Sequence, residues 1–286
     1  MILGSGEHTV SALRSVSVQW RNEAETLDAE PSPRAGRSRI TVDGVAFDAL
    51  REEEVVQHVF AALQRGRGGK LITPNVDILR QLRRPALAGI AERADLVVPD
   101  GMPIVWASRL QGRPLPERVA GSSLLWSLSR AAVAVNRSVF LLGGAEGIAE
   151  QATGRLQDEV PGLDVAGWNC PPFGFEKDPD LLEKTIGAVV EAQPDIVFVG
   201  LGFPKQENLM EQLAERLPGT WFVGCGGALT MTAGEVSRAP VWLQRIGLEW
   251  AHRLAMEPRR MARRYLVDDA PYAVGLLTRA FRHRTR

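Results

Sequence analysis

Short apolar runs alternate with helix-length amphipathic segments from Leu71 to Val223, and this alternation constrains the fold more than any other feature of the sequence. Apolar runs of this kind, bounded by Gly, Pro or Asn, are typical of strands buried in a parallel sheet. A segment that connects two parallel strands has to cross over the sheet and therefore covers one of its faces. The sequence predicts an α/β fold with a mostly parallel sheet and helices on both faces.

The elements follow one another in a regular order. The expected strands are Leu71–Thr73, Leu96–Val98, Ser138–Leu142, Leu163–Ala166, Asp195–Val199 and Thr220–Val223. The expected helices are Glu52–Gln64, Val76–Arg83, one opening at Pro85, one from Ile104, Ser123–Val135, Glu146–Glu159, Leu181–Ala192 and one with Pro204 at its first position. A hairpin with Asp43-Gly44 at its turn is expected in Ile40–Phe47.

Three regions of the chain differ in composition. Residues 1–37 are aperiodic and end in a stretch rich in Pro and Gly, so we predict that they are disordered. Residues 38–237 hold the strands and helices and form the predicted body. Residues 238–286 carry Trp and Leu at helical spacing among many arginines, which predicts a helical appendage. We expect the body to fold without this appendage.

The appendage also differs from the body in charge. The whole chain has a formal net charge of zero, which argues against a nucleic-acid partner. Residues 238–286 contain eleven arginines, no lysine and four acidic residues, so the appendage carries +7 and the remainder −7. One interpretation is a solvated face above a Trp/Leu core face. The other is a helix that lies on an anionic membrane surface.

Other features limit the compartment and the cofactors. Two cysteines, Cys170 and Cys225, are too few for a disulfide framework and predict a reducing compartment. The sequence shows neither a secretory pattern nor 18 consecutive apolar residues, so we expect any membrane contact to be at the surface. His58 and His252 are isolated histidines, and we predict no metal site.

Polar or glycine-rich turns follow five of the expected strands. They are Thr73-Pro74-Asn75, Pro99-Asp100-Gly101, Gly143-Gly144, Gly200-Leu201-Gly202 and Gly224-Cys225-Gly226-Gly227. The carboxyl ends of parallel strands share one edge, where backbone amides and helix amino-termini favour phosphate groups. The turns therefore predict a nucleotide-bearing ligand. The dinucleotide pattern is incomplete, because Lys205 stands where the third glycine belongs.

The turn after the second strand carries a carboxylate. Asp100 follows the strand end at Pro99 and precedes Gly101, so it can either meet a ligand or cap the next helix. Spacing alone does not separate these interpretations. Without a metal, a diphosphate leaving group needs arginine, which binds phosphate through two parallel hydrogen bonds. Arg118 is a candidate, with an exposed surface arginine as the alternative.

These segments together resemble one known family. From about Arg39 to Leu266 the chain is similar to the WecG/TagA/CpsF glycosyltransferases. The motifs that carry the resemblance are Thr73-Pro74-Asn75, Pro99-Asp100-Gly101-Met102, Pro114–Gly121, Phe140–Gly144, Gly202–Glu207 and Arg238-Ala239-Pro240. The resemblance implies a Rossmann-like body. It also implies inverting, metal-independent transfer from a UDP-sugar, without a cofactor, to a polyprenyl-diphosphate-linked sugar at the inner face of the cytoplasmic membrane, in cell-surface or exopolysaccharide biosynthesis.

The resemblance also assigns residues. Asp100 matches the proposed catalytic base. The residues expected around the nucleotide-sugar are Thr73, Asn75, Arg118, Gln206, Gly143, Gly144 and Gly202. In the appendage, Arg253, Arg260 and Arg263 match arginines that complete the site at the membrane. One departure is Thr230, which stands where many members carry Asp. The sequence leaves the donor sugar, the acceptor lipid and a homo-oligomeric state open.

Two other functions are compatible with the turns. A nicotinamide-dependent oxidoreductase would use the Gly143 or Gly200 turn, but it needs a ribose-binding acid on the next strand, and no residue is convincing in that place. A non-catalytic protein that binds nucleotide-sugars would bind the UDP-sugar without transferring the sugar.

Overall fold

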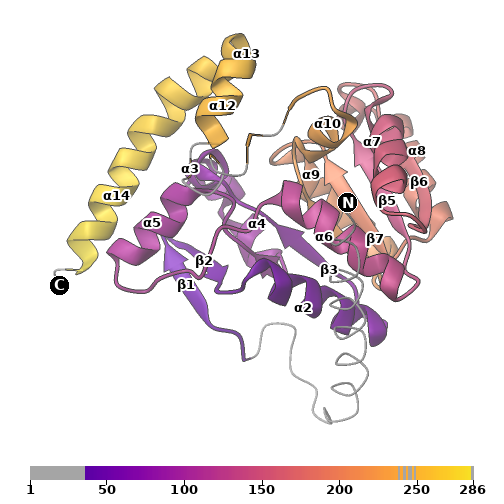
Figure 1. The fold of residues 1–286 in the computed structure, drawn as a ribbon, viewed down its shortest axis with the longest axis horizontal. Helices are drawn as coiled ribbons and strands as arrows, with labels where there is room; N and C mark the ends of the chain where they lie inside the picture. Colours follow the sequence, from indigo (N-terminus) through magenta and orange to yellow (C-terminus); the bar gives the residue numbers. More distant parts are fainter. Residues whose placement is uncertain (1–35, 238, 241–242, 244–246, 248, 285–286) are drawn as a thin grey trace, which may run out of the picture.

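The computed structural model of the 286-residue chain describes residues 36–237, 239–240, 243, 247 and 249–284 (Figure 1). Of the segment predicted to be disordered, residues 1–35 lie outside the described residues.

A parallel sheet forms the centre of the molecule. Among the described residues it has six strands in the order β4-β3-β8-β7-β5-β6, and every neighbouring pair is parallel. The strands are β3 (Gly69–Ile72), β4 (Leu96–Val97), β5 (Val139–Gly143), β6 (Val165–Asn169), β7 (Ile196–Gly200) and β8 (Trp221–Gly224). A separate antiparallel hairpin consists of β1 (Arg39–Val42) and β2 (Val45–Asp48). This arrangement confirms the predicted α/β, Rossmann-like fold.

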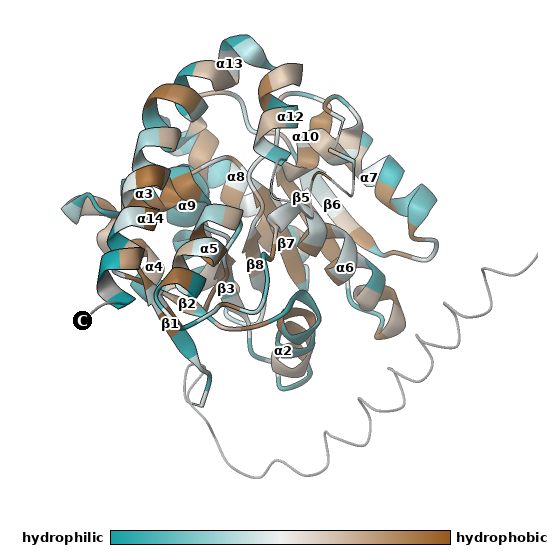
Figure 2. Cartoon of the chain, turned by 60° about the vertical axis from the view of Figure 1, so that its left-hand side comes forward, coloured by the Kyte–Doolittle hydropathy of each residue, from teal (hydrophilic) through white to brown (hydrophobic). Residues whose placement is uncertain are grey.

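Helices cover both faces of the sheet. The helices are α2 (Glu52–Gln64), α3 (Val76–Leu82), α4 (Pro85–Arg93), α5 (Met102–Leu110), α6 (Gly121–Ala134), α7 (Ile148–Glu159), α8 (Pro179–Ala192), α9 (Lys205–Arg216) and α10 (Ala228–Ala233), with a short 3₁₀ turn η1 (Phe175–Lys177). Successive strand residues face opposite layers. Leu141 belongs to the core layer that contains residues of α2, α6, α7 and α10, whereas Leu142 belongs to the layer that contains residues of α3, α4, α5, α8 and α9. Figure 2 shows the apolar strands between the two layers.

Some predicted boundaries are wrong. The fourth strand is predicted at Leu163–Ala166, but β6 spans Val165–Asn169, because the Leu163 amide donates to the Val160 carbonyl at 3.1 Å in the turn before the strand. Pro204 was expected at the first helical position, but it is the residue before α9, which begins at Lys205. Helix α10 is not predicted from the sequence, because its six residues are too few for a periodic pattern.

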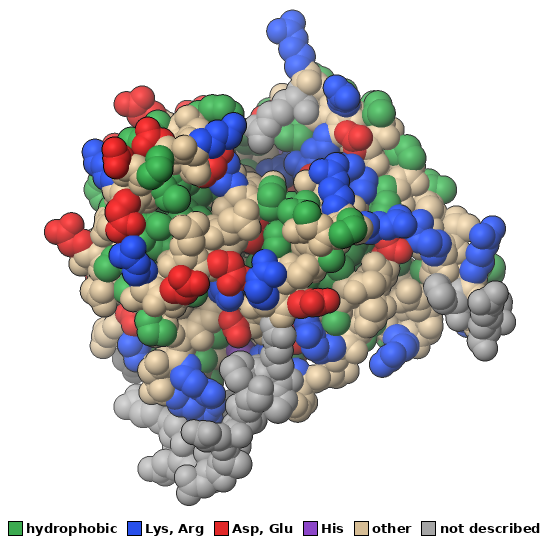
Figure 3. Space-filling model, turned by 180° about the vertical axis from the view of Figure 1, so that it is seen from behind, with side chains coloured by type: hydrophobic (Ala, Val, Ile, Leu, Met, Phe, Trp, Pro, Cys, Tyr) green, Lys and Arg blue, Asp and Glu red, His purple; other side chains and the backbone are tan. Residues whose placement is uncertain are grey.

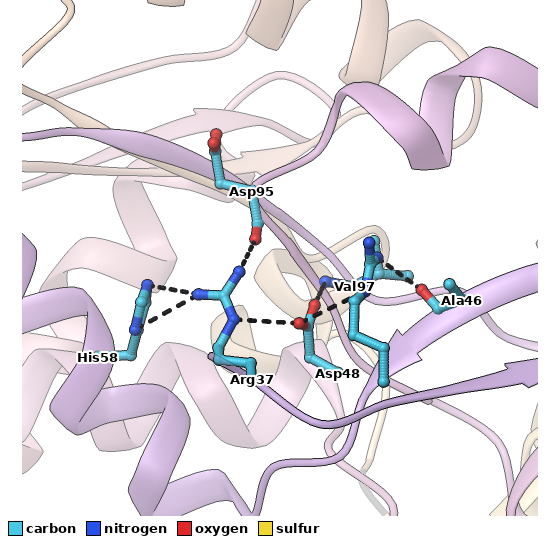
Figure 4. A network of polar contacts seen from close by, with 7 residues as sticks. Arg37, Ala46, Asp48, His58, Asp95 and Val97 are labelled. Carbon is cyan, nitrogen blue, oxygen red and sulfur yellow. Dashed lines mark hydrogen bonds and ion pairs between the residues drawn. The ribbon is translucent and has the colours of Figure 1, made fainter. Parts of the chain in front are cut away.

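A polar network fixes the hairpin to the sheet (Figure 4). Asp48 is fully buried; it accepts a hydrogen bond from the Val97 amide at 2.9 Å and pairs with Arg37 at 3.1 Å. Arg37 also donates to the Asp95 carbonyl at 2.7 Å and lies 2.8 Å from the His58 ring. Burial and the neighbouring Arg37 lower the pKa of His58 to about 4, so the imidazole is neutral and can accept from the guanidinium. Arg37 is the last residue of the segment predicted to be disordered, but these contacts fix it to the hairpin, to α2 and to the residue before β4.

The C-terminal region is helical, as predicted. It consists of α12 (Glu249–Met256), α13 (Pro258–Ala262), a π-helical segment η2 (Arg263–Asp269) and α14 (Ala270–Arg284). None of the described residues of α12 is buried, and Trp250 is 42% exposed against Tyr265, so the expected Trp/Leu core face is absent there. Most of the segment before α12, with Trp242 and Ile246, lies outside the described residues.

Helix α14 packs onto the body beside α5 (Figure 1). Leu276 and Ala280 are buried in the same core layer as the hairpin. Asp43 in the hairpin turn accepts hydrogen bonds from the Tyr272 hydroxyl at 2.6 Å and from Arg279 Nε at 2.9 Å. Because α14 contributes buried side chains, we no longer expect the body to fold independently of the C-terminal region.

Candidate active site

Backbone contacts between glycines join the turns that follow β5, β7 and β8. Gly143 has φ +122°, and a Cβ there would lie 2.5 Å from the Gly200 carbonyl oxygen, so only glycine permits this approach. The Gly144 amide donates to the same oxygen at 3.2 Å. The Cys225 amide donates to the Val199 carbonyl at 2.9 Å. The predicted convergence of these turns at one edge of the sheet is present.

Thr73 and Gln206 brace these turns from within the fold. The Thr73 hydroxyl is buried and donates to the Gly224 carbonyl at 3.1 Å, which links the ends of β3 and β8. Gln206 is 2% exposed, and its Oε1 accepts from the amides of Gly202 and Gly226, both at 3.2 Å. These contacts hold the two glycine turns at a fixed separation.

Asn75 lies beside the turn that carries Asp100. The Asn75 side chain caps α3 by accepting from the Ile78 amide at 3.0 Å. The backbone amide of Asp100 donates to the Pro74 carbonyl at 3.0 Å, so the two turns are joined directly. The side chain of Asp100 does not cap the helix that follows, where the N-cap residue is Gly101. The capping interpretation of Asp100 is therefore wrong.

Asp100 points instead toward Arg118 and the start of α6. Its carboxylate lies 3.6 Å from Arg118 Nη1 and accepts from the Gly121 amide at 3.4 Å. The Asp100 side chain remains 26% exposed. Burial in the site raises the pKa of Asp100 above the usual range of an aspartate, and the opposing attraction of Arg118 does not cancel this effect. A carboxylate with a raised pKa is a better proton acceptor than an ordinary aspartate.

Two residues of α12 act on this carboxylate through their charges. Glu249 accepts a hydrogen bond from Arg118 Nη1 at 2.8 Å, and both side chains are mostly buried. Arg253 lies one helical turn later; its Nη2 is 3.0 Å from the position of a Cβ on Gly227 and 3.6 Å from the Met231 sulfur. The positive charge of Arg253 favours the ionised form of Asp100. Side chains from the body and from the C-terminal region thus form one site.

The other two arginines predicted from the C-terminal region have no described contact with the site. Arg263 is exposed, and the side chain of Arg260 lies outside the described residues. Arg264 pairs with Asp77 on α3 at 3.2 Å and with Asp269 at 3.6 Å, so it fastens η2 to the helix that Asn75 caps. Only Arg253, of the three predicted appendage arginines, has a described side chain directed at the site.

Two carboxylates near the site, Glu249 and Glu207, are not among the residues predicted from the sequence. Glu249 forms its contact with Arg118 across 131 positions of the chain, so no local pattern could indicate it. Glu207 is 4% exposed and accepts from the Gln206 amide at 2.8 Å, while its other oxygen lacks a hydrogen-bond donor within the described structure. Burial raises the pKa of Glu207 to about 7.

The raised pKa of Glu207 predicts a pH-dependent stability. The folded state holds the proton up to about pH 7 and the unfolded chain only to about pH 4.5, so the wild type loses stability as the pH rises between these values. The Glu207→Gln variant stays neutral, and its free energy of unfolding should exceed that of the wild type by up to roughly 3 kcal/mol at pH 8, with no gain at pH 4.5. Urea unfolding at both pH values measures this difference. Glu215→Gln, at an exposed position of the same helix, is the control; an equal effect of Glu207→Gln at both pH values would contradict the prediction.

Two kinds of feature are absent from the residues that the structure describes. Within the described ranges, no group of three or more His, Cys, Asp or Glu side chains is placed to hold a metal ion. No helix in the described part of the chain combines the length and the apolar character needed to cross a bilayer.

Comparisons with known proteins found a matching family model and similar curated proteins. The family model described as "Glycosyl transferase WecG/TagA/CpsF family" matches residues 40–286. A Bacillus spizizenii protein named N-acetylglucosaminyldiphosphoundecaprenol N-acetyl-beta-D-mannosaminyltransferase is 33% identical over 202 residues, which cover 70% of this chain and 76% of that protein. Proteins of the same name from Bacillus subtilis and Staphylococcus aureus are 31% and 29% identical, over 66% and 80% of this chain and 70% and 89% of their own lengths.

Proposed function

Because the chain belongs to the WecG/TagA/CpsF family of glycosyltransferases, we propose that it transfers an N-acetylhexosamine-type sugar from a UDP-sugar to N-acetylglucosamine linked to polyprenyl diphosphate. The names of the curated relatives support this acceptor and this class of donor sugar. The family match favours a transferase over the nicotinamide-dependent oxidoreductase and the non-catalytic binding protein. The product would serve the synthesis of a cell-surface polymer.

The observation that carries the proposal is the position of Asp100 between Arg118 and the Gly121 amide, where Gly121 lies against Cys225 in the turn after β8. In the proposed step, Asp100 accepts the proton of the acceptor hydroxyl while that oxygen bonds to the anomeric carbon. The bond from this carbon to the diphosphate oxygen breaks on the opposite face, and UDP leaves with the electron pair, so the configuration inverts. Arg118 and Arg253 offset the charge that develops on the diphosphate, a task that a metal ion performs in other enzymes.

Thr73, Asn75 and Gln206 contribute by positioning in this scheme. They hold the turns of β3, β7 and β8 around the donor, and the glycines allow its phosphates to approach backbone amides. Thr230 on α10 is partly exposed, so it is available to influence the choice of donor.

A donor screen tests the proposal. The enzyme is incubated with a synthetic polyprenyl-diphosphate N-acetylglucosamine acceptor and, separately, UDP-N-acetylmannosamine, its uronic acid or UDP-glucose, and products are read by mass spectrometry. We expect the mass of one added N-acetylhexosamine, unchanged by EDTA. Transfer from none of the donors, or from UDP-glucose alone, would refute the proposal, and a strict need for manganese would refute its metal-independent step.

We also propose that the enzyme binds the inner face of the cytoplasmic membrane as a peripheral protein. In the C-terminal region, Met256, Leu266 and Val267 have between 53% and 65% of their surface exposed. They lie close in the sequence to the exposed Arg259 and Arg263. Figure 3 shows basic side chains gathered on this part of the surface. Apolar side chains beside arginines suit insertion among anionic headgroups.

Replacing Leu266 and Val267 together by Ser should weaken binding to anionic liposomes by roughly tenfold or more, because two apolar side chains no longer enter the lipid. Co-sedimentation measures the loss, and 1 M salt should weaken the wild type as well. Phe173→Ser, at a fully exposed position of the body, is the matched control. Unchanged sedimentation of the double variant would contradict the membrane role.

A further inference from the structure

Arg118 is shared between two carboxylates, those of Glu249 and Asp100. Its Nη1 donates to Glu249 at 2.8 Å and lies 3.6 Å from Asp100. The three side chains are between 14% and 26% exposed, so bulk water screens them weakly. Although burial opposes its charge, these two carboxylates raise the pKa of Arg118, which stays a cation.

The contact with Glu249 uses the same nitrogen that faces Asp100. A diphosphate that binds Arg118 through its guanidinium therefore has to compete with the Glu249 carboxylate. A carboxylate left beside a diphosphate would also repel it at close range. The structure thus contains an internal anion at the position where the donor's leaving group is proposed to bind.

We propose that Glu249 is a positioning residue that holds Arg118 in the donor-free enzyme and yields it to the diphosphate of the donor. This inference rests on the proposed function, because it takes Arg118 as the diphosphate ligand. Glu249 is the first residue of α12, and Arg253 lies four residues later on the same helix. When Arg118 leaves Glu249 for the diphosphate, Arg253 is the charged side chain of α12 that faces the diphosphate.

The same contact influences the base. Asp100 faces Arg118, Glu249 and Arg253, and the negative charge of Glu249 adds to the effect of burial in raising the pKa of Asp100. Removing that charge should therefore lower the pKa of Asp100. A residue with a purely structural role would not produce this change together with tighter donor binding.

The Glu249→Gln variant separates charge from shape, because Gln keeps an oxygen that can accept from Arg118. Isothermal titration with UDP should show about tenfold tighter binding than the wild type, as the competing charge is gone. In steady-state assays we expect a lower KM for the donor without a higher kcat, and an acid limb of kcat/KM at lower pH. The control Glu191→Gln removes an exposed carboxylate at the opposite end of the sheet. It should change neither the affinity for UDP nor the KM for the donor.

The outcomes distinguish the two proposals. Failure of the wild type to bind UDP would refute the proposed function itself. Binding of UDP by the wild type with equal or weaker binding by Glu249→Gln would refute the role of Glu249 and leave the proposed function standing. Thermal unfolding compares the stability of both variants with that of the wild type. The inference requires Glu249→Gln to stay folded and to bind UDP more tightly, so a variant that unfolds and binds UDP weakly would contradict it.

Discussion

Replacing Asp100 by Asn is expected to lower turnover by about 10²- to 10⁴-fold while UDP binding persists. Asn cannot accept the proton of the attacking hydroxyl, whereas its shape preserves the turn between β4 and α5. Its amide oxygen can still accept from the Gly121 amide, which lies 3.4 Å from the carboxylate in the wild type. Single-turnover assays with the polyprenyl-diphosphate acceptor measure the rate, and titration with UDP measures binding.

The pH profile of the wild type provides an independent check. A base has to be deprotonated, so activity should fall as the pH drops through the pKa of Asp100, and burial places this limb above the usual range of aspartate. The control is Asp158→Asn, at an exposed position on α7. This variant should have the turnover rate of the wild type and the same loss of activity at low pH. If Asp100→Asn turned over substrate at nearly the wild-type rate, Asp100 would not be the catalytic base.

The order of the elements was predictable because it depends on local patterns. Apolar runs such as Val139–Leu142 are fully buried strands, and glycine turns follow them because strands approach one another closely there. Element ends were less predictable. Helix α7 begins at Ile148 rather than at Glu146, since Gly147 precedes it in the left-handed region at φ +80°. A local pattern indicates a helix, but tertiary contacts decide its first turn.

The candidate site was predictable where a motif follows a strand. Asp100 and Arg118 lie together although 17 residues separate them, because the Val119 amide donates to the Pro99 carbonyl at 2.9 Å and brings the loop back. Other contacts of the site join segments that are distant in the sequence. Gln206 accepts a hydrogen bond from the Gly226 amide, and Glu249 accepts one from Arg118. Such contacts follow only from the assembled sheet and the docked C-terminal helices.

The docking of the C-terminal region predicts the second large effect. Leu276 on α14 is 1% exposed and packs in the core layer that contains the hairpin and α5. Leu276→Asp would place a charge in this apolar contact and should lower the free energy of unfolding by about 4 kcal/mol or more. Val274→Asp, two residues earlier on the same helix and 65% exposed, should change it by about 0.5 kcal/mol at most.

Urea unfolding followed by circular dichroism compares these two variants, and limited proteolysis shows whether α14 is released. A change confined to Leu276→Asp would mean that α14 belongs to the same cooperative unit as the sheet, because its loss exposes core side chains of the body. Equal stability of the two variants would mean that α14 is not docked in solution. Helix α12 carries Arg253 and is linked to α14 through α13 and η2, so an undocked α14 would also withdraw Arg253 from the site. Leu276→Asp should therefore weaken UDP binding, whereas Val274→Asp should not.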